Sequence, residues 1–132
     1  MRGARAVQQV LIEEDPPIDI AIIIVWIDML AADSEETASL SARIFHDKPV
    51  RQFHDSNRYL GKFIAESLGS RDVIAWDTYL FYAKGSEWKE NMPAPLDWAH
   101  QLDDPWADPD HFAWDDDLPA RLREITNRLI RN

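Results

Sequence analysis

The chain has 132 residues, of which 45% are hydrophobic and 29% are charged, and its 24 Asp and Glu against 14 Lys and Arg give a formal net charge of -10 at pH 7. A chain of this length buries about two-thirds of its unfolded surface around one core, so we expect a single domain over residues 1–132. The acidic balance disfavours nucleic acid and anionic membranes as partners, and the absence of cysteine excludes disulfides, thiolate metal sites and thiol redox chemistry in this chain.

The hydrophobic segments are short. The longest continuous apolar run, residues 20–27, is well below the roughly 20 residues that a membrane-spanning helix needs. The first residues, Met-Arg-Gly-Ala-Arg, are not followed by a signal-type hydrophobic region. We therefore expect a cytoplasmic protein.

The first 45 residues predict a helix, a strand and a second helix. Apolar side chains at spacings of three and four predict a short helix over residues 4–11. Residues 20–27 are apolar and rich in β-branched side chains, a pattern typical of a parallel strand that is buried on both faces. Replacing Ile23 by Asp is therefore expected to unfold the domain. A capping-box pattern predicts a second helix that begins after Asp33.

The same alternation continues along the chain. Residues 50–53 predict a second strand, and residues 55–68 predict a helix followed by a glycine suited to a left-handed C-terminus. Residues 73–82 form a β-rich run, and residues 84–88 predict a turn and the start of a paired return strand. Apolar residues at helical spacing predict a closing helix over residues 118–129.

An acidic segment separates the last strand from the last helix. Residues 90–120 contain nine acids, five of the eight prolines and no Lys or Arg. Tryptophans recur every eight to ten residues from Trp88 to Trp114, whereas disordered acidic segments are poor in aromatics. We expect residues 89–117 to form an irregular but ordered loop, named here the acidic flap. Its candidate interaction residues are Trp98, His100, Trp106 and Trp114.

The order of elements predicts an α/β fold with helices on both faces of a sheet. It resembles the thioredoxin-like fold in its peroxiredoxin-type variant. Residues 50–55 (VRQFHD) resemble the strand that ends in Asp before a helix, and residues 73–82 (VIAWDTYLFY) resemble the antiparallel strand that follows. The resemblance implies a three-layer α/β/α sandwich with a mixed sheet and a hairpin at one side.

Two parts of that family are missing. The chain lacks the first strand and the redox Cys-x-x-Cys, so the resemblance does not extend to oxidoreductase activity. Loss of the first strand leaves unpaired backbone groups along one edge of the sheet, which native proteins cover or pair. We therefore expect homodimerisation through that edge.

Five polar or aromatic residues are expected at one rim of the sheet. Ligands of parallel α/β sheets bind outside the carboxyl ends of the strands. The predicted strands place there a candidate cleft of Asp28, His54, Asp55, Trp76 and Asp77. Such a set suits a hard metal ion or a carboxylate–His acid/base pair. The alternative is that Asp55 caps the next helix and the other four are solvated.

A repeated His-Asp pair provides a second, weaker metal signal. His46-Asp47 and His54-Asp55 offer imidazole and carboxylate ligands for zinc, but their spacing matches no compact metal motif. We therefore expect no metal ion and no cofactor.

Two functional hypotheses remain. The first is a non-redox thioredoxin-like binding or interaction module, homodimeric, with a protein or small-molecule ligand and no enzymatic activity. The alternative is a small metal-binding protein or hydrolase-type enzyme that uses the carboxylates and His at the strand rim.

Overall fold

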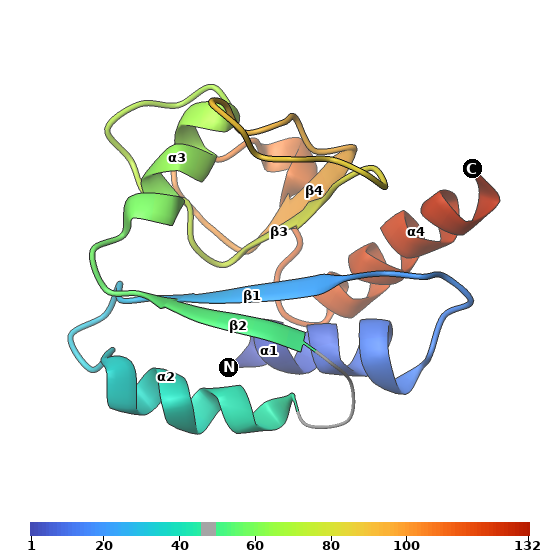
Figure 1. Ribbon diagram of the computed structural model, residues 1–132, viewed down its shortest axis with the longest axis horizontal. Coiled ribbons are helices and arrows are strands. Elements are labelled where there is room, and N and C mark those ends of the chain that lie inside the picture. Colours follow the sequence, from blue (N-terminus) through green and yellow to red (C-terminus); the bar gives the residue numbers. More distant parts are fainter. Residues whose placement is uncertain (46–49) are drawn as a thin grey trace.

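The computed structural model describes residues 1–45 and 50–132, which form a mixed α/β structure (Figure 1). Four α-helices, four strands and three shorter helical turns follow one another along these residues. In chain order they are α1 (Arg2–Val7), the π-helical turn η1 (Gln8–Glu13), β1 (Ile22–Ile27), α2 (Glu35–Ser41), the 3-10 turn η2 (Ala42–Ile44), β2 (Val50–Asp55), α3 (Tyr59–Ser67), β3 (Thr78–Phe81), β4 (Asp97–His100), the 3-10 turn η3 (Pro109–His111) and α4 (Asp117–Arg131).

The strands of the described residues form two separate two-stranded sheets. β1 and β2 are parallel, in a register that runs from the pair Ile22–Val50 to the pair Ile27–Asp55. β3 and β4 are antiparallel, with Thr78 opposite His100. The α/β class is as predicted, whereas the single mixed sheet of the expected sandwich is replaced by these two pairs.

The partner of β3 lies further along the chain than the sequence suggests. The return strand is β4, inside the acidic flap, and not the segment at residues 87–88. β3 is also shorter than the predicted run, because Asp77 adopts a φ of 48° and turns the chain just before Thr78. A four-residue strand between prolines and acids carries too little periodic signal to be recognised in the sequence.

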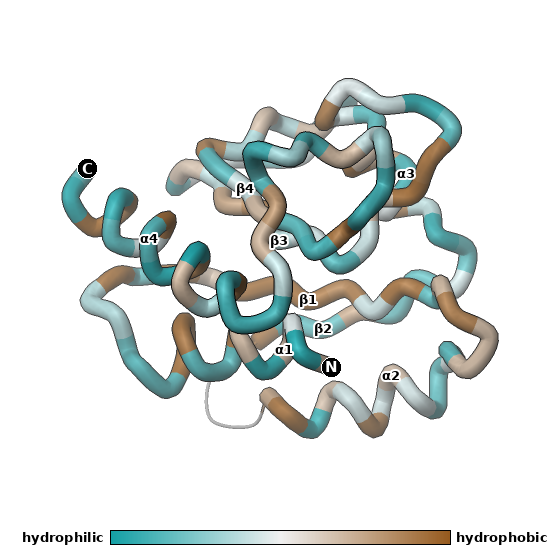
Figure 2. Tube along the Cα trace, turned by 180° about the vertical axis from the view of Figure 1, so that it is seen from behind, coloured by the Kyte–Doolittle hydropathy of each residue, from teal (hydrophilic) through white to brown (hydrophobic). Residues whose placement is uncertain are grey.

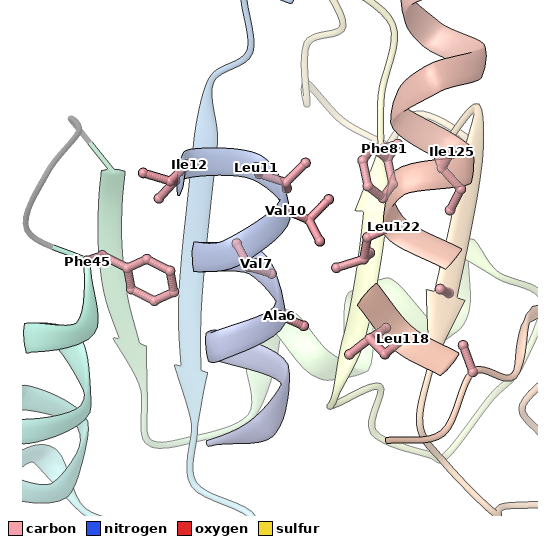
Figure 3. Packing of buried hydrophobic residues seen from close by; sticks show 12 residues of the cluster. Ala6, Val7, Val10, Leu11, Ile12, Phe45, Phe81, Leu118, Leu122 and Ile125 are labelled. Carbon is pink, nitrogen blue, oxygen red and sulfur yellow. The ribbon is translucent and has the colours of Figure 1, made fainter. Parts of the chain in front are cut away.

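The main core covers one side of the β1–β2 pair and continues to α4, β3 and β4. Figure 1 shows α1 and α2 on that side and α3, β3 and β4 on the other. The closely packed core joins α1 and η1 to α4 and to the inner residues of β3 and β4 (Figure 3). Leu118, Leu122 and Ile125 supply the buried face of α4, at the spacing that the sequence predicts.

No residue of strand β1 is fully buried, so the expectation of burial on both faces is wrong. Ile22, Ile24 and Trp26 pack against the main core. Ile23 points the other way, because side chains alternate along a strand, and it remains 61% exposed. Figure 2 shows how strongly hydrophobic this strand is.

The helix ends show how local chemistry sets the boundaries. Ser34, not Asp33, caps α2, through a capping box with Thr37. The Asp33 carboxylate instead accepts the backbone N–H groups of Met29 and Leu30, at 2.8 and 2.6 Å, and so closes the turn after β1. Gly69 has a φ of 93°, the left-handed conformation expected after α3.

No helix among the described residues is long and apolar enough to cross a membrane.

Candidate functional site

An open apolar groove lies between the uncovered face of β1–β2 and helix α3. Its volume is about 420 Å³. The lining residues come from both strands, from α3 and from the loop after β3: Ile23, Val25, Phe53, His54, Asp55, Tyr59, Leu60, Phe63 and Trp88. Apart from His54 and Asp55, all of these side chains are aliphatic or aromatic. The groove is therefore suited to apolar contacts.

Strand alternation and helical spacing together build the groove. Phe53 is the register partner of Val25, and both belong to the face opposite the main core. On α3, Tyr59 and Phe63 are four residues apart and share one side of the helix. Trp88 packs edge-to-face on Phe63, with ring centroids 5.9 Å apart. The groove wall is thus an aromatic cluster that spans three segments of the chain.

The groove's large side chains are unusually exposed for their type. Tyr59 is 65% exposed, Phe53 56%, Phe63 51% and Trp88 48%. Large aromatic side chains in a monomeric domain are normally well covered. Their exposure around one groove marks this surface as one that another molecule can cover.

Gly61 fixes the position of α3. A Cβ atom at Gly61 would lie 2.6 Å from Cγ2 of Ile74 and 2.7 Å from the backbone oxygen of Ala75. The backbone N–H of Ala75 donates to the Gly61 carbonyl at 2.9 Å. Any residue larger than glycine at position 61 would push α3 away from the backbone at residues 74–75.

Asp28 and His54 meet at the carboxyl ends of β1 and β2. Nε2 of His54 donates to Oδ1 of Asp28 at 2.7 Å, and the two side chains are 23% and 24% exposed. The Nε atom of Arg58 donates to the backbone oxygen of Asp28 at 2.6 Å. Among the described residues, no hydrogen bond to Nδ1 of His54 is found. The pair has the geometry of an oriented imidazole base.

Asp55, the third residue of the predicted cleft, caps α3. Its carboxylate accepts the backbone N–H groups of Tyr59 and Leu60, at 3.1 and 2.8 Å. These bonds satisfy donors that the first turn of a helix otherwise leaves unpaired. Asp55 thus lies beside the Asp28–His54 pair with its carboxylate engaged in structure.

Asp77 and Trp76 have hydrogen-bond partners of their own. The Asp77 carboxylate accepts the Tyr79 hydroxyl at 2.5 Å and the side-chain amide of Gln101 at 3.0 Å. Burial, reinforced by the neighbouring Asp77 charge, raises the pKa of Tyr79 well above its ordinary range. Trp76 is half-buried, and its carbonyl accepts the Thr78 hydroxyl.

The Asp77 network supports the start of α1. A Cβ atom at Gly3 would lie 1.7 Å from the Tyr79 hydroxyl oxygen, so α1 lies directly against this network. Among the described residues, no hydrogen bond or ion pair joins Asp77 to Asp28 or His54. The Asp77 carboxylate is therefore engaged with Tyr79 and Gln101, whereas Asp28 pairs with His54.

The acidic flap is held by its own polar contacts. His100 is 1% exposed; its Nε2 donates to the Asp108 carbonyl at 2.7 Å and its Nδ1 accepts the Leu102 N–H at 3.0 Å. This pair of bonds requires the neutral imidazole with hydrogen on Nε2. The Trp98 ring stacks on His111 with centroids 4.3 Å apart. Trp98 and His100 therefore order the flap.

The other two flap tryptophans differ in exposure. Trp106 is partly buried against the small core formed by α3 and its neighbours. Trp114 is 53% exposed, with the Arg2 guanidinium 5.8 Å from its ring centroid. Of the four predicted interaction residues, Trp114 is the one with a largely free surface.

Asp97 is a polar anchor that the sequence does not reveal. Its carboxylate is 13% exposed and accepts hydrogen bonds from Arg121, at 3.1 and 3.3 Å, and from Arg128. His111 Nδ1 lies 3.6 Å away. These contacts tie β4 to α4, and the 24-residue and 31-residue separations of the partners hide them from sequence reasoning.

The apolar groove residues are not part of the sequence-based site, whereas His54 and Asp55 belong to both. Phe53, Tyr59 and Phe63 fit the pattern of ordinary core positions. A signal was nevertheless present, because α3 carries two adjacent apolar stripes, and only one is needed to pack the helix. In the structure Ile64 is buried and Phe63 is exposed.

The part of the chain that the structure describes contains no group of three or more His, Cys, Asp or Glu side chains placed to hold a metal ion. The His46-Asp47 pair of the zinc hypothesis lies outside the described residues.

Comparisons of this chain with protein-family models, with curated proteins and with solved structures find no match.

Proposed function

We propose that the chain is a non-redox binding module, related in arrangement to thioredoxin-like proteins, and that its groove binds apolar side chains of a protein partner. The observation that carries this proposal is the exposure of Phe53, Tyr59, Phe63 and Trp88 around one surface groove. Aromatic side chains are the commonest anchors of protein interfaces, because each buries a large area at a small cost in conformational entropy.

The shape of the groove favours a protein over a small molecule. Small-molecule sites enclose most of the ligand surface. Here the aromatic walls are themselves about half exposed, so an occupant would be covered on one side only. Contact with a second surface is the arrangement that would bury both the walls and the occupant.

The thioredoxin-like relation is supported by the order and direction of the strands. The parallel pair β1–β2 is connected through α2, and α3 precedes the antiparallel pair β3–β4. The last described helix, α4, packs on β4 through the main core. With no cysteine in the chain, this arrangement would serve binding and not thiol exchange.

Binding of an apolar fluorescent dye such as anilinonaphthalene sulfonate tests the proposal. Phe53→Asp places a charge in the groove, and Leu40→Asp is its matched control, since Leu40 is 53% exposed on α2 and does not line the groove. Wild type and Leu40→Asp should bind the dye equally, and Phe53→Asp should lose most of the signal. Equal binding by all three proteins would refute the groove as the binding surface.

The Asp28–His54 pair supports a second candidate function, acid–base catalysis at the strand ends. The 2.7 Å contact orients the imidazole and leaves Nδ1 able to take a proton from water. If this pair is catalytic, His54→Gln should lower the hydrolysis rate of an activated ester at neutral pH at least tenfold. A rate equal to that of wild type would remove the enzymatic alternative.

A further inference from the structure

We infer that the partner that covers the groove is a second copy of this chain, related by a two-fold axis. This inference rests on the proposed function, because it names the occupant of the same surface. The contact uses the face of the β1–β2 pair together with α3, whereas the dimer expected from the sequence uses a strand edge.

The exposed area matches what a small dimer needs. Phe53, Tyr59, Phe63 and Trp88 are between 48% and 65% exposed, and Ile23 is 61% exposed. With about 200 Å² for each aromatic side chain, these residues offer roughly 500 Å² of apolar surface. Two copies would bury about 1,000 Å² together, which is the lower limit for a specific interface. Interfaces of this size give weak, reversible association, so a micromolar dimer is expected.

The charge distribution selects this face for self-association. The whole chain has a net charge of -10, and residues 90–120 hold nine acids without a Lys or Arg. Residues 50–89, which supply seven of the nine lining residues, hold six Lys and Arg against five Asp and Glu. Two copies can therefore approach groove to groove with little repulsion, whereas contact through the acidic flaps would oppose two strongly negative surfaces.

The charged groups at the rim of the groove are engaged within the chain. Glu87 and Lys89 flank Trp88 and pair with each other at 3.2 Å. The Asp55 carboxylate is occupied by the backbone of α3. A partner protein with a strong positive charge would be drawn to the acidic flap instead. The groove is best complemented by another apolar and nearly neutral surface, such as the groove of a second copy.

A two-fold contact also explains why association would stop at two copies. In such a contact the same patch is used by both partners, so each dimer consumes both grooves. Docking of the groove onto a different surface of a second copy would leave a free groove at one end and would produce longer chains.

Sedimentation equilibrium of the full chain tests the inference. Wild type should pass from monomer to dimer over a hundredfold concentration range centred in the micromolar region. Phe63→Asp, at a groove residue that is 51% exposed, should remain monomeric, and the matched control Leu40→Asp should dimerise like wild type. Phe53→Asp provides a second groove variant, and melting curves establish that all three variants fold.

Each other result overturns the inference in a recognisable way. A wild-type protein that stays monomeric while its dye binding depends on Phe53 would leave the groove as a binding surface for a different partner. A monomer whose dye binding does not depend on Phe53 would remove the proposed function as well. A dimer that survives both Phe53→Asp and Phe63→Asp uses another face. Association that continues beyond dimer would indicate that the groove docks onto a different surface of the second copy.

Discussion

Replacing Gly61 by Ala is the sharpest test of how α3 is held against its neighbours. The added methyl group would lie 2.6 Å from Cγ2 of Ile74 and 2.7 Å from the carbonyl oxygen of Ala75. The Ile74 side chain can rotate, but the carbonyl belongs to the backbone and accommodates a methyl only if α3 moves away. The substitution should therefore destabilise the fold and displace one wall of the groove.

The magnitude follows from two opposing effects. Overpacking in a tight contact costs about 1–3 kcal/mol, and a backbone clash belongs in the upper part of that range. Ala is favoured over Gly inside a helix by about 1 kcal/mol. The free energy of unfolding should fall by about 1–2 kcal/mol, which corresponds to a decrease of roughly 0.5–1 M in the urea midpoint.

Urea unfolding followed by circular dichroism measures this difference. Lys62→Ala is the matched control, because Lys62 is the next residue of α3 and is exposed. Its midpoint should stay within about 0.3 M of wild type, as expected for a surface substitution. A Gly61→Ala protein as stable as wild type, or more stable, would refute the close approach of α3 to residues 74–75.

Three further predictions concern the core, the Asp77 network and the exposed face of β1. Leu122→Ala should cost about 2–5 kcal/mol in chemical denaturation, because Leu122 is 0% exposed in the main core; a loss below about 1 kcal/mol would contradict that packing. Burial keeps Tyr79 protonated in the folded state at a pH where an unfolded tyrosine ionises, so stability should decline as pH rises above about 10. Tyr79→Phe should decline less over the same range, and identical alkaline melting curves would argue against the burial of this hydroxyl. Ile23→Asp should remain folded, with a melting temperature near that of wild type, because Ile23 is 61% exposed. Unfolding of this variant would show instead that Ile23 is buried in the core.

The helices and the two parallel strands could be predicted because their signals are local. The buried stripe of α4, the left-handed Gly69 and the β-branched run of β1 each follow from neighbouring residues. The burial of β1, in contrast, depends on segments that are distant in the sequence. The apolar run of β1 is compatible with cover on both faces, and only the structure shows that Ile23 is exposed and the rest of the strand half-buried.

The candidate site, too, could be predicted only in part from the sequence. Asp28 and His54 follow two parallel strands, so their meeting at 2.7 Å could be anticipated from strand order. The partners of Asp77 could not be predicted, since a left-handed residue just before β3 leaves no clear signal for its bonds to Tyr79 and Gln101. The groove was missed because an exposed Phe or Tyr on a strand or helix has the same sequence pattern as a buried one.

The central claim is that the groove formed by β1, β2 and α3 is the surface through which this protein binds. Backbone amide chemical shifts, recorded by NMR while the protein is diluted from high to low concentration, test it most directly. The largest changes should occur at Ile23, Phe53, Phe63 and Trp88, with the residues of the acidic flap unchanged. Changes concentrated between residues 97 and 115, with the groove unaffected, would contradict the account.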